Sequence, residues 1–372
     1  MRHLVLHIGM PKTGTTSIQA SLSAGIADPR FRLLSMDTAF GNQMVGALFH
    51  NSFQQHPSYF RAVLSDRQLK QFRRRAYRYL DRSLLQAARD GVTPIISAEI
   101  AWVFEEADCV SLKRFMSDRG FETSVICYMR APLDFFESSF HQLVIAGVGR
   151  SWADLFEKHR FADSIHTADR VFGRDNVTPL FFEPAAFPQQ CVVHHFCQQI
   201  GLSPTAVNIV RVNEGLSLDA LKLLYTADRA NAFRYESFLS RLRRRLLIAR
   251  LRDLPGPRMR FCPSITGTFR KSIEQEWPWL EDRLGRSIPI SLLPREPAAE
   301  IRSEADMFDV SGNARAWLAE QAGARMTRSS GGAEPAEQVL DHLRRLAMVN
   351  CRREIAKAIS EGVRLRLRQP WT

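Results

Sequence analysis

An apolar strand that ends at a glycine and leads directly into a helix is the feature that most constrains this chain. Residues 3–8 read HLVLHI, Gly9 follows, and a helical pattern begins at Thr15. Residues 9–16 read GMPKTGTT, close to the phosphate-binding pattern G-x-x-x-x-G-K-[ST]. The lysine, Lys12, lies inside the loop, and Thr15 stands in its usual place. The stretch predicts a phosphate-binding loop between a strand and a helix.

The residue types of this loop suit an anionic ligand. Gly9 and Gly14 let the backbone turn sharply and approach a ligand closely. The amides of the first helical turn and the helix dipole attract negative charge, and Thr13, Thr15 and Thr16 add hydroxyl groups. A helix-capping turn with an incidental lysine would explain neither the two glycines nor the threonines.

Strand-like and helix-like segments alternate along the first 230 residues. Four short apolar segments lack strict alternation, which is typical of strands covered on both faces: Leu4–Ile8, Pro94–Ser97, Ser124–Met129 and Val177–Phe182. Five segments have helical patterns: Thr15–Ala24, Asp66–Ala88, Leu133–Ala146, Val192–Ile200 and Leu218–Ala230. We therefore predict an α/β, P-loop-like three-layer fold with a central parallel sheet flanked by helices, and a helical C-terminal extension.

The chain divides into three predicted regions. Residues 1–230 form the nucleotide-binding core, and residues 231–328 form a basic, mainly helical extension packed on it. Residues 329–372 form a linker and a terminal helix, with SSGGAEPA at 329–336 as the flexible part. The extension contains RLRRRLLIARLR at 241–252, in which six of twelve residues are arginine. The role of this cluster is left open by the sequence.

Composition narrows the class of protein and partner. The 372 residues carry a net charge of +12, which favours anionic partners such as nucleotides, acidic glycans or a membrane surface. No apolar run approaches the ~18 residues of a membrane span, so we expect a cytoplasmic protein, with peripheral membrane contact left open. Six scattered cysteines without a C-x-x-C pair predict reduced, mostly buried thiols and no metal site. No nucleic-acid recognition module accompanies the charge.

The wording Pro-Lys-Thr-Gly-Thr-Thr at 11–16 resembles the first nucleotide-binding motif of the sulfotransferase superfamily, including its bacterial members. The resemblance implies that the loop wraps the 5′-phosphate of 3′-phosphoadenosine 5′-phosphosulfate. It also implies that Lys12 reaches the oxygen between phosphate and sulfate, and that Lys12, Thr13, Gly14, Thr15 and Thr16 bind the donor.

A second motif of the superfamily follows in YMRAPLDFFESSFHQ at 128–142. Arg130 ends the third predicted strand, and Ser138 lies eight positions later. The resemblance implies that this arginine and serine hold the 3′-phosphate. The common form reads Arg-Asp-Pro, whereas this chain has Ala131 before Pro132, and Ser139 competes with Ser138 for the role. Parallel strands present their carboxyl ends at one edge of a sheet. If the first and third predicted strands are near neighbours, the two motifs therefore face the same crevice.

The C-terminal Arg-Lys-Gly loop of the family has no clear match here. RVNEGLS at 211–217 resembles a segment of bacterial members instead, which makes Arg211 and Asn213 candidates for covering the nucleotide.

Sulfuryl transfer also requires a base for the proton of the acceptor. Glu99 ends the second predicted strand and is our first candidate, since glycan-modifying sulfotransferases use a glutamate. His7 and His141 are alternatives. Glu99 would otherwise be a helix N-terminal glutamate that interacts with the helix dipole.

The predicted function is therefore transfer of a sulfuryl group to a hydroxyl or amine acceptor, with a glycan among the candidates and without a metal. The alternatives are a P-loop small-molecule kinase that uses ATP and magnesium, and a non-catalytic nucleotide- or glycan-binding module. A kinase would need an acidic magnesium ligand, a role open to Glu99. The acceptor site is expected in loops at about 35–60, 100–110 and 145–165.

Overall fold

The structure is a computed structural model that describes residues 2–36, 41–53, 65–147, 162–210, 215–230, 238–262, 265, 267–287, 300–323 and 338–348. The chain forms two compact units. The first comprises Met1–Phe135, Lys158–Val212 and Lys271–Ile290, and the second comprises Phe136–Glu157, Asn213–Arg270 and Ser291–Thr372. The predicted boundary near residue 230 stays a prediction.

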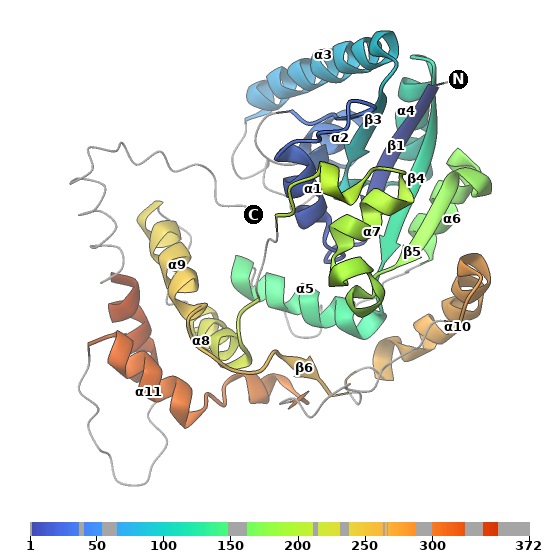
Figure 1. The fold of residues 1–372 in the computed structure, drawn as a ribbon. Coiled ribbons are helices and arrows are strands. Elements are labelled where there is room, and N and C mark those ends of the chain that lie inside the picture. The colour runs from blue at the N-terminus through green and yellow to red at the C-terminus, as the bar shows by residue number, and fades with distance from the viewer. Residues whose placement is uncertain are drawn as a thin grey trace. The chain divides into compact units, whose positions relative to one another are not determined.

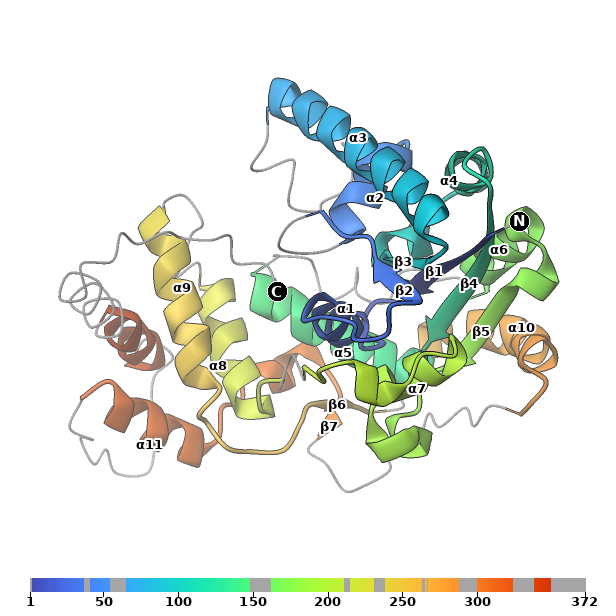
Figure 2. The same ribbon diagram turned by 45° about the horizontal axis from the view of Figure 1, so that its top comes forward.

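The first unit is built around a five-stranded parallel sheet with the order β2-β3-β1-β4-β5 (Figures 1 and 2). Its strands are β1 (Arg2–Gly9), β2 (Phe31–Leu33), β3 (Thr93–Ser97), β4 (Phe121–Met129) and β5 (Val177–Phe181). The parallel sheet flanked by helices confirms the predicted α/β fold, and the four predicted strands are all present. The short edge strand β2 is an addition.

The register of the sheet fixes which residues leave it side by side. β1 lies between β3 and β4, with His7 opposite Ser97 and Gly9 opposite Tyr128. The first and third predicted strands, β1 and β4, are therefore direct neighbours. Because all the strands are parallel, the segments that follow β1, β3 and β4 leave from the same edge.

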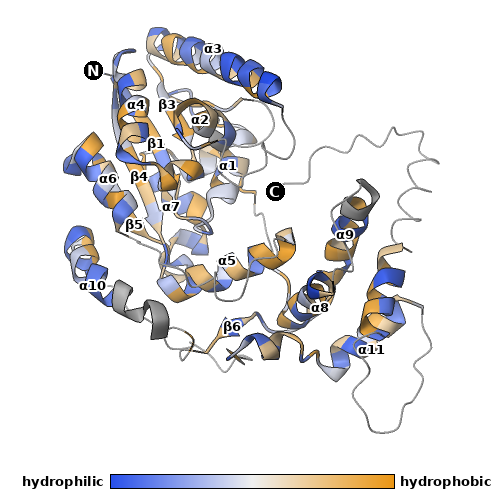
Figure 3. Cartoon of the chain, turned by 180° about the vertical axis from the view of Figure 1, so that it is seen from behind, coloured by the Kyte–Doolittle hydropathy of each residue, from blue (hydrophilic) through white to orange (hydrophobic). Residues whose placement is uncertain are grey.

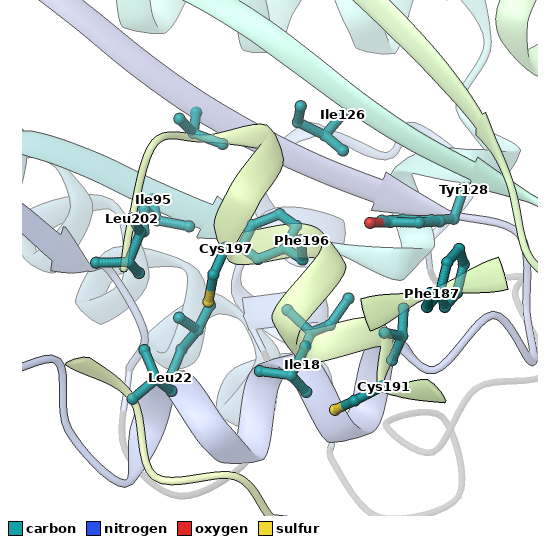
Figure 4. Packing of buried hydrophobic residues seen from close by; sticks show 14 residues of the cluster. Ile18, Leu22, Ile95, Ile126, Tyr128, Phe187, Cys191, Phe196, Cys197 and Leu202 are labelled. Carbon is teal, nitrogen blue, oxygen red and sulfur yellow. The ribbon is translucent and has the colours of Figure 1, made fainter. Parts of the chain in front are cut away.

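Helices cover both faces of this sheet. On one face, α1 (Thr15–Ser23) and α7 (Val192–Gln199) pack over the strands, and Ile18, Phe196 and Tyr128 belong to one buried cluster (Figure 4). On the other face, α4 (Glu106–Ser117) packs on β4, where the Thr123 hydroxyl faces the Met116 sulfur at 3.7 Å. Helix α6 (Asp163–Phe172) also packs on β4 and β5.

The remaining helices of the first unit lie mostly beside β3. Helix α2 (Gly41–Phe49) lies beside α3 (Asp66–Asp90), as Figure 2 shows. It also packs against β3 and the short 3₁₀ helix η1 (Glu99–Val103). Helix α10 (Gly267–Leu284) contributes its later part to this unit. The segments 35–60 and 100–110, which were expected to be loops, are partly helical, because α2, η1 and the start of α4 occupy them. Most of the third segment, 145–165, lies outside the described residues, and the acceptor role of all three stays a prediction.

The second unit is mainly helical. It contains the later part of α5 (Pro132–Ala146), α8 (Leu218–Arg229), α9 (Phe238–Leu251), α11 (Gly312–Gln321) and a helical segment at 338–348. The two short strands β6 (Arg260–Phe261) and β7 (Glu300–Ile301) pair in parallel. The predicted linker at 329–336 lies outside the described residues.

Helix α9 shows that the arginine cluster at 241–252 is not a uniform surface. Arg244 is only 3% exposed, and its guanidinium forms an ion pair with Asp228 of α8. The same guanidinium donates to the carbonyl oxygens of Val144 and Ile145 at the end of α5. Among the described residues, no helix is both long enough and apolar enough to cross a bilayer.

Candidate functional site

The loop between β1 and α1 is held in place by its own backbone and by β4. The Met10 amide donates to the Tyr128 carbonyl oxygen at 2.8 Å, and the Thr13 hydroxyl donates to the Met10 carbonyl oxygen at 2.7 Å. Lys12 has a φ of 73°, a left-handed conformation that side chains other than glycine rarely adopt. The contacts around Lys12 therefore impose its backbone conformation, a form of strain that is typical of functional loops.

The two glycines of the loop are required by space as well as by backbone geometry. Gly14 has a φ of 78°, and a Cβ there would lie 2.7 Å from Cγ1 of Val192 in α7. A Cβ on Gly9 would lie 2.9 Å from the hydroxyl oxygens of both Thr13 and Thr15. The loop is thus packed from both sides, and its backbone approaches its neighbours more closely than any side chain would allow.

The start of α1 leaves donors for an anion. Its N-cap is Gly14, which offers no side chain to cap the helix, and its first turn contains no acidic residue. The Thr15 hydroxyl is buried and has no hydrogen-bond partner among the described residues. Uncapped helix amides together with an unsatisfied buried hydroxyl are typical of a site that a ligand completes. These features agree with the predicted phosphate-binding loop, whose ligand stays a prediction.

Three candidate residues come together at the carboxyl edge of the sheet. Lys12 follows β1, Glu99 begins η1 directly after β3, and Arg130 follows β4. These three strands are adjacent in the order β3-β1-β4. The Arg130 guanidinium donates through Nη1 to the Lys12 carbonyl oxygen at 3.0 Å, so it also supports the strained loop.

The charges of these three residues act on one another. Burial lowers the pKa of the Lys12 ammonium, the Glu99 carboxylate partly offsets this, and the Arg130 guanidinium lowers the pKa further. Burial raises the pKa of the Glu99 carboxyl, and Lys12 opposes that change. A cation and a carboxyl with perturbed pKa values at one sheet edge are typical of functional sites.

Two neighbours of Arg130 are functional candidates that the sequence reasoning missed. The Asp134 carboxylate lies 3.9 Å from Arg130 Nε, and the guanidinium lies 5.5 Å from the ring centroid of Phe182. Asp134 stands four positions after Arg130 within YMRAPLD, a spacing that could have indicated the pair. Phe182 follows β5, and nothing in the sequence connects it to Arg130.

His7 lies beneath the loop. Its side chain is fully buried, and Nδ1 lies 2.8 Å from the Ser97 hydroxyl oxygen at the end of β3. Nε2 has no hydrogen-bond partner among the described residues, and burial lowers the pKa of the imidazole to about 3. His7 is therefore neutral near pH 7.

The other candidates lie elsewhere in the chain. Ser138 is partly buried on α5, beyond the point where this helix passes into the second unit. His141 lies one turn later, and its Nε2 accepts the Leu216 amide at 2.8 Å. Arg211 and Asn213 lie outside the described residues. The roles predicted for these four residues stay predictions.

Comparison with known proteins adds little to this geometry. No protein-family model matches the chain, and no curated protein matches it. The crystal structure of a sulfotransferase from Alicyclobacillus acidocaldarius aligns with 62% of this chain and 92% of its own, at 19% identity and a TM-score of 0.38. At this TM-score the two structures share too little geometry to assign a fold or an activity. Function is inferred from the site residues alone.

Proposed function

We propose that this protein is a sulfotransferase that moves a sulfuryl group from 3′-phosphoadenosine 5′-phosphosulfate to a hydroxyl or amine acceptor. The observation that carries the proposal is the convergence of Lys12, Glu99 and Arg130 at the ends of three adjacent parallel strands. The uncapped start of α1 lies in the same loop as Lys12. One anion-binding loop, one cation and one carboxyl are the groups that this reaction requires.

The site residues fit a donor with negative charge at both ends. The amides at the start of α1 and the Thr15 hydroxyl would hold the 5′-phosphate, and Lys12 would face the phosphosulfate bridge. Arg130 would hold the 3′-phosphate, since a guanidinium binds phosphate oxygens with paired, charge-assisted hydrogen bonds. The donor supplies the activated sulfuryl group, and the protein supplies position and charge.

In the proposed reaction, the acceptor displaces the nucleotide from sulfur. The acceptor oxygen or nitrogen forms a bond to sulfur as the bond from sulfur to the phosphate oxygen breaks. The electron pair of that bond remains on adenosine 3′,5′-bisphosphate, where Lys12 offsets the developing negative charge. The Glu99 carboxylate accepts the proton that leaves the acceptor.

The pKa changes of Glu99 and Lys12 agree with the roles proposed for these two residues. Burial raises the pKa of Glu99, which makes the ionised carboxylate a stronger base at neutral pH. The nearby Lys12 ammonium opposes this rise and helps to keep the carboxyl ionised. The rate should therefore fall at low pH as Glu99 gains a proton, and at high pH as Lys12 loses one.

Ligand-dependent thermal stability tests the proposal against its rivals. Adenosine 3′,5′-bisphosphate should raise the melting temperature, because a ligand at 100 times its Kd adds about 2.7 kcal/mol of stability. ATP with magnesium should stabilise the protein much less. Equal or greater stabilisation by ATP, with a magnesium requirement, would favour the kinase instead. Nucleotide binding without transfer of labelled sulfate to any member of a glycan and metabolite panel would favour the binding module.

A further inference from the structure

Helix α3 displays a row of positive charge on its outer face. Figure 3 shows mainly hydrophilic residues along this helix, interrupted by apolar ones. Seven cations of α3 are exposed, and we call the six that lie between residues 67 and 82 the α3 stripe: Arg67, Lys70, Arg74, Arg75, Arg78 and Arg82. At 100° per residue they fall within an arc of about 140°, and at 1.5 Å per residue they extend over about 22 Å.

Acidic side chains do not neutralise this stripe. None of its six members forms an ion pair with another described residue. Asp81 lies within the same arc, but it binds Arg119, with its Oδ1 2.9 Å from the Nε and 2.5 Å from Nη2. Asp90, at the end of α3, pairs with Arg32 at 2.8 Å. The six cations are therefore available to an anionic ligand, which would reduce their mutual repulsion.

The helix that carries the stripe is firmly anchored. Ser65 and Gln68 form a reciprocal cap at its start, and Leu80 and Leu84 on its inner face are fully buried. Arg73 turns inward, and its Nε donates to the Ala47 carbonyl oxygen of α2 at 2.8 Å. Rigid presentation of six cations lowers the ordering cost of binding an extended ligand.

The first turns of α3 are linked to the candidate base through one small core. Leu69 and Phe72 of α3 pack in a cluster with Ala47, Phe53 and Ile100. Ile100 directly follows Glu99 in η1. The N-terminal half of the stripe is therefore one layer of side chains from the segment that holds Glu99.

We propose that the α3 stripe is the docking surface for an acidic polysaccharide, and that this class of molecule is the acceptor. This inference rests on the proposed function. Five of the six cations are arginine, whose planar guanidinium binds carboxylate and sulfate groups with two hydrogen bonds. A band of cations along one side of a helix fits a linear polyanion, and its N-terminal half packs near the segment that holds Glu99.

Two other anionic partners fit this surface less well. Single-stranded nucleic acid binds to rows of exposed aromatic rings as well as to cations. The exposed ring on α3, Tyr77, is engaged by the Arg119 guanidinium. A membrane-bound helix buries its apolar face in lipid, but the apolar face of α3 is already buried in the protein.

Binding of a heparin dodecasaccharide to two charge-matched variants tests the proposal. The test variant is Arg74→Gln/Arg78→Gln/Arg82→Gln. The control variant is Arg243→Gln/Arg245→Gln/Arg252→Gln, which removes the same charge from exposed positions in the 241–252 cluster. At fixed ionic strength the test variant should lose about 10-fold or more in affinity, with a shallower salt dependence. The control should lose less than about 3-fold. Poly(U) RNA and phosphatidylserine vesicles are measured in parallel.

Equal losses in the two variants, or no loss in either, would overturn the docking surface. So would tighter binding of RNA or vesicles with the same dependence on the α3 stripe. Adenosine 3′,5′-bisphosphate binding, measured on all three proteins, separates this inference from the proposed function. If the parent protein binds heparin through α3 but does not bind the nucleotide, the proposed function fails and the docking surface stands.

Discussion

Arg130 and Arg244 are both arginines that bind backbone carbonyl groups, yet their surroundings differ. Arg244 is 3% exposed, and Asp228 balances its charge inside the second unit. The side chain of Arg130 is 23% exposed, and its Nε is 3.9 Å from the Asp134 carboxylate. It also lies close enough to Lys12 to lower the pKa of that ammonium.

This difference distinguishes a charge that is paired within the protein from one that we propose to bind a ligand. A buried ion pair of the Arg244 kind is fully compensated within the protein. Lys12 and Arg130 repel each other at the end of the sheet, with Glu99 and Asp134 offsetting only part of that repulsion, and an added anion would reduce it further. The comparison predicts that changes at the Lys12 site affect ligands and rates, whereas changes at Arg244 affect folding.

The largest effect is expected on the rate, from Glu99→Gln. The change keeps the shape of the side chain but removes the base, so the single-turnover transfer rate should fall by about 10²–10⁴. Affinity for adenosine 3′,5′-bisphosphate should stay within a few-fold of the parent. The residual rate should also lose the fall at low pH that protonation of Glu99 causes. A variant that transfers sulfate at the parental rate would move the role of base to His141 or His7.

Arg244→Ala should have the next largest effect, on stability alone. Removing the guanidinium leaves the Asp228 carboxylate without its buried partner, which should cost about 3–5 kcal/mol in urea unfolding. The double variant Arg244→Leu/Asp228→Leu should recover most of this loss, because it leaves no unpaired charge. A strong loss of nucleotide affinity in the folded double variant would contradict the structural role of Arg244.

Arg130→Ala, in contrast to Arg244→Ala, should mainly affect ligand binding. Loss of charge-assisted hydrogen bonds should weaken binding of a nucleotide with a 3′-phosphate by about 1.5–3 kcal/mol. Binding of the same nucleotide without the 3′-phosphate should change little in isothermal titration calorimetry. The exposed Arg252→Ala serves as a control for net charge. Equal weakening of both nucleotides would mean that Arg130 mainly supports the loop through the Lys12 carbonyl group.

The smallest effect is expected on the pH dependence of stability, when His7 is replaced. Burial lowers the pKa of His7 from 6.5 to about 3 in the folded protein, so between these values the unfolded chain binds the extra proton. Stability must then fall as the pH falls through this window, by about 2 kcal/mol between pH 7 and pH 5. In His7→Gln this contribution should disappear from the pH dependence of urea unfolding. An unchanged dependence would mean that His7 keeps its ordinary pKa.

The parts of the fold that could be predicted are those with a strong local pattern. The apolar runs of β1, β3, β4 and β5 and the long amphipathic pattern of α3 were all assigned correctly, with ends that differ by a few residues. Strand β2 has only three partly buried residues, too few to show a period. Helix α2 was not predicted, because Gly46 lowers its helix propensity. In the structure Gly46 packs closely on Phe53 and Ile100.

The residues of the candidate site also differ in how far the sequence could identify them. Gly9, Lys12 and Gly14 could be identified because a loop between a strand and a helix carries its signal in consecutive residues. Glu99 depended on the prediction that neighbouring parallel strands end at one edge. The burial of His7 against Ser97 and the position of Phe182 below Arg130 depend on the packing of distant segments. The sequence alone does not specify such contacts.

The closely packed loop at Gly14 has a consequence for the thermodynamics of recognition. A side chain at Gly14 would meet Val192, and hydrogen bonds to the Tyr128 and Met10 carbonyl groups hold the loop. A loop that is already in its final conformation loses little conformational entropy when a nucleotide arrives. Calorimetry should therefore record a heat-capacity change that reflects only the surface covered by the nucleotide, without the larger signature of a segment that folds upon binding.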